Sequence, residues 1–185
     1  MKKIALATLL ALVAVTAGAV EIGAEYQNFE GKNGTASANN YQVFVKGNIN
    51  NNFAVDAKAT QDIAKTNDGI ASSAMETGVT GKYNLGYVTP YTRVSVGEWY
   101  KTTNNFTYYG VEPGVLVPIA STGVTASVGW RYRNSFHDVN EFETRTWRAK
   151  LGYDLTTTDN IYVGYDRMRG DIQANVGLVG YSHSF

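Results

Sequence analysis

The residues that could support catalysis lie in two places along this 185-residue chain. Ser135, His137 and Asp138 stand close together in one polar segment. Nucleophilic catalysis uses these residue types, but rigid elements must hold them at hydrogen-bonding distance, which neighbours in a single loop rarely achieve. In the second place, Ser182–Ser184, a strand would direct the central His183 away from both serines. We therefore expect no enzymatic activity.

Metal and cofactor chemistry also find little support. The chain contains no cysteine and only two histidines, which excludes a thiolate site. No metal-ligand spacing and no glycine loop of the phosphate-binding type is present. We expect neither a metal nor a cofactor.

Charged residues instead recur at alternate positions of many segments. Such a face could be an ordinary solvated surface, or the lumen of a closed barrel lined by ion pairs. We expect Glu112 and Arg131, on neighbouring strands, to be partners in such a lumen. The residues assigned to the lumen are Glu21, Glu25, Lys46, Asp56, Lys58, Glu76, Lys82, Arg93, Glu112, Arg131, Arg133, Arg148, Lys150, Asp154 and Asp166.

The elements that position these charges show a side-chain period of two, which is typical of β-strands. Short connections alternate with longer ones rich in Asn, Thr and Ser, and this pattern indicates an antiparallel up-and-down barrel. We expect ten strands, with eight as the alternative, and a bulge near Pro90 or Pro113 because proline cannot donate to the ladder. The predicted strands are Val20–Asn28, Tyr41–Ile49, Phe53–Gln61, Met75–Asn84, Tyr87–Gly97, Thr107–Val117, Val124–Arg133, Thr144–Asp154, Ile161–Met168 and Gln173–Phe185.

The opposite face of these strands is mainly aliphatic, with aromatic residues near both ends. Two aromatic belts around an aliphatic band favour a membrane barrel over a soluble lipocalin-like barrel, which has no need of two belts. The expected outer belt is Tyr26, Tyr41, Tyr109, Trp130, Tyr132, Trp147 and Tyr165. The expected inner belt is Phe53, Tyr83, Tyr153, Tyr181 and Phe185.

The first residues have the pattern of a secretory signal peptide. Lys2 and Lys3 precede an apolar run, and small residues follow at Ala17–Ala19. Cleavage after Ala19 leaves 185 − 19 = 166 residues, so we expect a signal peptide over 1–19 and one barrel domain over 20–185. Loss of the two lysines takes the formal charge from 0 to −2, which argues against a nucleic-acid partner.

The last strand, ending at Phe185, resembles the closing strand of Gram-negative outer-membrane β-barrels, and the whole mature chain is similar to the opacity-protein and OmpA-like class. This resemblance implies an outer-membrane location and implies that Phe185 is the signal for the barrel-assembly machinery. We expect a monomer in contact with membrane lipid. The expected function is a porin-like or structural protein with a narrow charged lumen that passes at most ions or small solutes. The alternatives are a surface adhesin acting through its outer loops and, less favoured, an enzyme at the rim.

Three arginines share the outward face near the outer aromatic belt. They can reach water by extending their side chains, or they can bind the phosphates of lipopolysaccharide, which the planar guanidinium suits better than an ammonium group does. The residues predicted to contact lipopolysaccharide are Arg145, Arg167 and Arg169.

Overall fold

The computed structural model describes residues 19–65, 72–101, 105–119, 122–137 and 142–185. All regular structure in these ranges is β-strand, and no helix long and apolar enough to cross a membrane occurs among them. The strands are β1 Ala19–Gly31, β2 Ala38–Asn48, β3 Phe53–Ala64, β4 Ser72–Lys82, β5 Thr89–Tyr100, β6 Asn105–Ile119, β7 Val124–Ser135, β8 Thr144–Asp154, β9 Asp159–Gly170 and β10 Ala174–Ser184.

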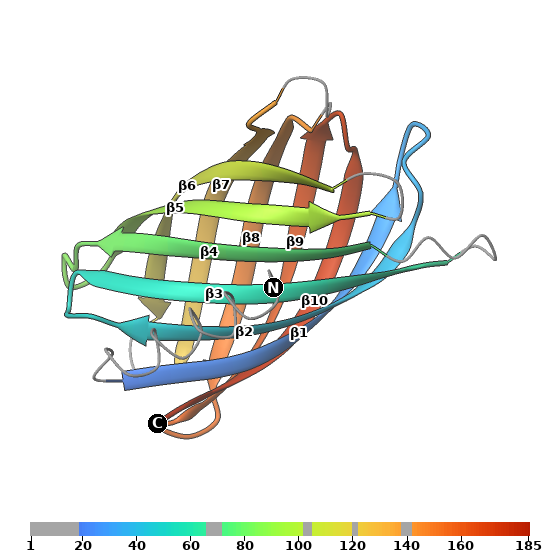
Figure 1. Ribbon diagram of the computed structural model, residues 1–185. Helices are drawn as coiled ribbons and strands as arrows, with labels where there is room; N and C mark the ends of the chain where they lie inside the picture. The colour runs from blue at the N-terminus through green and yellow to red at the C-terminus, as the bar shows by residue number, and fades with distance from the viewer. Residues whose placement is uncertain (1–18, 66–71, 102–104, 120–121, 138–141) are drawn as a thin grey trace.

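The ten strands form one closed antiparallel barrel in which each strand pairs with its neighbours in sequence (Figure 1). Closure is made by β1 and β10, which run in register from Glu21 opposite Ser184 to Gly31 opposite Ala174. The barrel therefore has no unpaired strand edge, and every strand can satisfy its backbone groups within the sheet. The predicted fold class and the number of ten strands are confirmed, and the eight-strand alternative is excluded.

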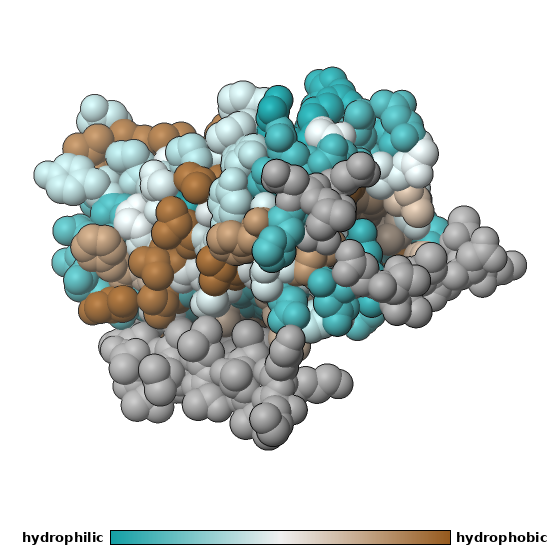
Figure 2. Space-filling view, turned by 45° about the horizontal axis from the view of Figure 1, so that its top comes forward, coloured by the Kyte–Doolittle hydropathy of each residue, from teal (hydrophilic) through white to brown (hydrophobic). Residues whose placement is uncertain are grey.

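The two faces of the wall differ as the alternation predicts. Outward-facing aliphatic side chains are exposed, as at Val43, Val94 and Val163, whereas the inward-facing Ala54 is almost completely buried. Figure 2 shows apolar side chains gathered over the left and centre of the wall and hydrophilic ones clustered at the upper right. An apolar outer face around a charged interior is the reverse of a soluble barrel, and it is the arrangement of a transmembrane barrel.

We call the end that carries both termini of the barrel the turn end, and the opposite end the loop end. At the loop end the strands are longer than the sequence predicted: β1, β3 and β5 each continue for three more residues. Pairing continues there because hairpin partners keep their register into polar sequence, as at Asn39 opposite Ile63. The predicted loops are shortened accordingly, and several residues expected in loops lie inside the barrel.

The bulge predicted near Pro90 or Pro113 is wrong. The pairing of β6 with β7 is interrupted between Val111 and Gly114, but the register is the same on both sides, so no extra residue is inserted. The pairing of β5 with β6 is continuous through both prolines. The sheet therefore accommodates the two prolines, which have no backbone N–H group, by losing local hydrogen bonds, and the strand register does not shift.

Of the predicted signal peptide, residues 1–18 lie outside the described ranges. β1 begins at Ala19 and pairs with Asn48 of β2 at that position. The strands from β1 to β10 run from Ala19 to Ser184, and the cleavage site and domain bounds stay predictions.

Candidate functional site

The candidate site is the barrel interior, which holds two adjoining cavities. A turn-end cavity of about 480 Å³ and a loop-end cavity of about 80 Å³ share Gln42, Lys58 and Arg148 in their linings. Every charged residue assigned to the lumen from the sequence lines one of these cavities except Asp154. Asp154 is exposed at the end of β8 and accepts a hydrogen bond from Asn160 Nδ2 at 2.8 Å.

The first ion-pair cluster, the Arg93 network, joins β3, β4 and β5. Arg93 Nε and Nη2 donate to the two carboxylate oxygens of Asp56 at 2.8 and 2.6 Å, and Nη1 contacts Glu76 Oε1 at 2.5 Å. Lys58 Nζ lies 3.3 Å from the same Glu76 oxygen. Arg93 reaches Asp56 across β4 because Gly78 stands opposite Asp56, where a Cβ atom would lie 2.6 Å from Arg93 Cζ.

The second cluster, the Arg148 network, joins β6, β8 and β9. Arg148 Nη1 contacts Glu112 Oε2 at 2.8 Å, and its Nε contacts Asp166 Oδ2 at 2.9 Å. The predicted Glu112–Arg131 pair is therefore wrong: the partner of Glu112 is Arg148, two strands away. Adjacency along the ladder did not decide the pairing, because a long side chain can cross an intervening strand.

The remaining pairs lie toward the turn end. Lys150 Nζ contacts Glu25 Oε2 at 2.8 Å, and Lys46 Nζ contacts Glu21 Oε2 at 2.9 Å. The Lys46 side chain is 41% exposed, whereas that of Arg93 is only 9% exposed. The interior thus changes from wet at the turn end to nearly dry at the two arginine networks.

Sequence reasoning missed an apolar cluster inside the loop end. Two groups of packed side chains meet at Ile172, and neither was expected in the lumen. The signal was present, because Phe29, Trp99 and Phe106 continue the inward parity of β1, β5 and β6 into segments predicted to be loops. The loop-end apolar cluster consists of Trp99, Phe106, Tyr108, Phe142, Ile172, Phe29, Met168, Ala174 and Val176.

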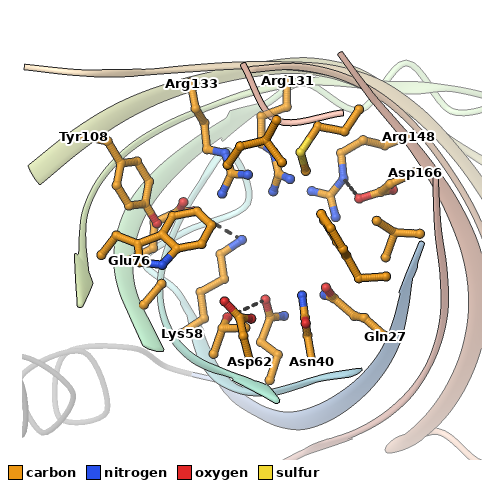
Figure 3. Close-up of a pocket in the computed structure, with 18 residues that line it drawn as sticks. Gln27, Asn40, Lys58, Asp62, Glu76, Tyr108, Arg131, Arg133, Arg148 and Asp166 are labelled. Carbon is orange, nitrogen blue, oxygen red and sulfur yellow. Dashed lines mark hydrogen bonds and ion pairs between the residues drawn. The ribbon is translucent and has the colours of Figure 1, made fainter. Parts of the chain in front are cut away.

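The loop-end cavity lies between this cluster and the two networks. Arg131, Arg133 and Arg148 direct their guanidinium groups into the same space, toward which Lys58 extends from the opposite wall (Figure 3). The Arg133 guanidinium carbon lies 5.6 Å from the Tyr108 ring centroid, over the ring. The cavity is therefore cationic on one side and aromatic beside it.

The residues considered for catalysis are placed as follows. Ser135 Oγ donates to the backbone oxygen of His137 and accepts from its N–H, and Asp138 lies outside the described residues. His183 Nδ1 lies 2.9 Å from Asp159 Oδ1 on the outer face, whereas Ser182 is buried inside the barrel. Within the described ranges no group of three or more potential metal ligands is found.

The outer wall carries the other predicted residues. Arg145 stands opposite Arg169, and Trp147 stands opposite Arg167, so the three arginines and an exposed tryptophan share one patch on β8 and β9. The Arg145 guanidinium also pairs with Glu143. At the turn end Phe185 is 74% exposed, and its N–H donates to Val20 O at 2.8 Å.

Comparisons with protein-family models and with curated protein sequences found no match. Comparison with solved structures found outer-membrane barrels. An outer membrane channel from Pseudomonas putida F1 has a TM-score of 0.61 at 8% identity, over 91% of this chain and 96% of that one. The β domain of the Bordetella autotransporter BrkA has a TM-score of 0.60 at 12% identity, over 90% and 99%.

The KdgM porin has a TM-score of 0.53 at 13% identity, over 89% of this chain and 99% of that one. At such identities the likeness concerns the fold alone. With its closure, its apolar outer wall and its charged interior, the chain has the fold of the outer-membrane β-barrel proteins.

Proposed function

We propose that this chain is a porin-like or structural protein of the outer membrane of a Gram-negative bacterium, monomeric and without a catalytic step or cofactor. Its interior would pass at most water, ions or very small solutes. The observation that carries this proposal is the pair of arginine networks across the lumen, between a cavity of about 480 Å³ and one of about 80 Å³. A ten-stranded barrel is already far narrower than a barrel of 16–18 strands, and these side chains narrow it further.

A solute passing through the lumen would meet side chains of both charges, in nearly equal numbers. The lining of both cavities carries the cations Lys46, Lys58, Lys82, Arg93, Arg131, Arg133, Arg148 and Lys150, and the anions Glu21, Glu25, Asp56, Asp62, Glu76, Glu112 and Asp166. Eight cations against seven anions leave a formal charge of +1. We therefore expect weak selectivity for small anions over cations.

The test is single-channel recording from the refolded protein in planar lipid bilayers. We expect a small conductance in the wild type and a larger one in Arg148→Gln, because this substitution removes the side chain that joins Glu112 to Asp166. The matched control is Arg167→Gln, which removes the same charge from the outer wall. Absence of conductance from the wild type and from Arg148→Gln would reject passage and leave the binding role of the outer loops as the alternative.

The same proposal includes three partners of the outer surface. Membrane lipid would surround the aliphatic band, the barrel-assembly machinery would recognise Phe185, and lipopolysaccharide phosphates would contact the arginine patch on β8 and β9. The last is supported by three guanidinium groups beside aromatic side chains on one exposed face. Charge on the lipid face is tolerated near the membrane interface, where it can meet water or phosphate.

A further inference from the structure

We propose that the loop-end cavity binds a small oxyanion, a carboxylate or a phosphate group, through Arg131 and Arg133. This binding site is a separate proposal from the passage of solutes. It requires that a small anion can enter the lumen, but not that the anion can pass through the barrel. Three observations support the proposal. Arg131 and Arg133 have no ion-pair partner among the described residues, the nearby carboxylates already bind other groups, and aromatic side chains enclose the cavity.

Two guanidinium groups in the cavity wall lack ion-pair partners. Within the described residues neither Arg131 nor Arg133 has a carboxylate within 4.0 Å, although Arg131 is only 8% exposed. The Nε atom of each is buried and has no hydrogen-bond acceptor there. A buried guanidinium without an ionic partner is unfavourable, so an anion bound at this place would offset the cost of burying the charge.

Each carboxylate of the cavity wall already has a hydrogen-bond or ion-pair partner for one of its oxygens. Glu76 is bound by Arg93 and Lys58, and Asp166 Oδ2 is bound by Arg148. Asp62 Oδ2 accepts from Ser72 Oγ at 2.5 Å. The lining has four cations, at Lys58, Arg131, Arg133 and Arg148, against these three carboxylates, which gives a formal charge of +1.

Unsatisfied donors gather around the same cavity. Of the lining atoms without a partner, Trp99 Nε1, Arg131 Nε and Arg133 Nε can only donate, whereas Asn40 Oδ1 and Asp166 Oδ1 accept. Donors therefore exceed acceptors, and a ligand that brings several acceptor oxygens fits this imbalance better than an apolar or cationic ligand.

The enclosure of the cavity strengthens this preference. Tyr108 and Phe142 pack beside Arg133, whose guanidinium carbon lies 5.6 and 5.4 Å from their ring centroids. Both rings are almost completely buried, and they belong to the loop-end apolar cluster, several members of which also line the cavity. Charge–charge attraction is stronger in such a weakly solvated space than in water.

Size and geometry indicate the class of anion. A volume of about 80 Å³ exceeds what one water needs, roughly 10–15 Å³, but it is small for an aromatic acid. Guanidinium groups present parallel N–H donors that match two oxygens of a carboxylate or phosphate, a geometry that a spherical halide cannot use. Acetate and inorganic phosphate are therefore suitable probes, and chloride is the control anion.

The experiment is isothermal titration of the refolded barrel in zwitterionic detergent with sodium acetate, sodium phosphate or sodium chloride. We expect saturable binding of acetate, phosphate or both by the wild type, and binding at least about tenfold weaker in Arg131→Gln, since bonds to a charged partner are lost. Lys32→Gln, which removes an exposed cation outside both cavities, should bind as the wild type does. The acetate and phosphate titrations separate a carboxylate site from a phosphate site.

Arg133→Gln, at a less buried position, provides the same test if Arg131→Gln fails to fold. Thermal unfolding gives a second readout: the bound anion should raise the unfolding temperature of the wild type and not that of the arginine variant. Absence of saturable binding and of any rise in unfolding temperature would overturn the proposal. Equal binding of chloride, or wild-type affinity in a folded Arg131→Gln or Arg133→Gln variant, would also overturn it.

Discussion

The Arg93 network offers the most direct test of how the interior is held together. Arg93→Gln removes a side chain that makes three charged contacts with Asp56 and Glu76 and is only 9% exposed. Breaking a buried ion pair costs about 3–5 kcal/mol, because the remaining charge is left without compensation. Glu76 keeps Lys58 at 3.3 Å, and Asp56 borders the turn-end cavity, where water can reach it. We therefore expect a loss near the lower limit, about 3 kcal/mol of unfolding free energy.

The measurement is equilibrium unfolding in urea with the barrel in detergent or lipid vesicles, followed by tryptophan fluorescence. The matched control is Lys46→Gln, which removes one cation from the same lumen. Lys46 makes one contact with Glu21, and their side chains are 41% and 25% exposed, so its loss should cost at most about 1 kcal/mol. Asp56→Asn should restore part of the stability of Arg93→Gln, because it removes the stranded charge. Equal losses from Arg93→Gln and Lys46→Gln would refute the distinction between the dry networks and the wet turn end.

Three other perturbations have defined outcomes. Gly78→Ala should destabilise the wild-type barrel by about 1–3 kcal/mol because its Cβ would displace the Arg93 guanidinium. It should cost little in the Arg93→Gln background, whereas Gly177→Ala, with no atom within 4 Å of the added Cβ, should be neutral in both. Deletion of Phe185 should sharply lower the amount of protein in the outer membrane, and normal membrane levels would count against its role as an assembly signal. Lipopolysaccharide should raise the unfolding temperature of the wild type more than that of a variant in which Arg145, Arg167 and Arg169 are all replaced by glutamine. Equal stabilisation of both proteins would mean that these arginines extend to water and do not bind lipopolysaccharide.

The sequence by itself determined the wall of the barrel. Alternation with a period of two assigns each side chain to one face, and a shift of one residue would place charge in lipid, so register and orientation follow from the pattern. This is why the inward placement of Arg93 and the closure by the last strand were predictable. The ten strands followed as well, because each short turn or polar connection separates one alternating segment from the next.

Only the tertiary structure decided which charges meet and which apolar side chains lie inside the loop end of the barrel. Glu112 binds Arg148 instead of its neighbour Arg131 because long side chains cross strands wherever the curvature of the barrel brings them together. The sequence predicted strands that are too short at the loop end, because strand pairing extends beyond the apolar band into polar sequence. The longer strands place Phe29, Trp99 and Phe106 inside the barrel. Period-two alternation assigns side chains to faces but carries no distances across a closed interior. That Arg131 has no ion-pair partner among the described residues therefore becomes visible only when all ten strands are in place.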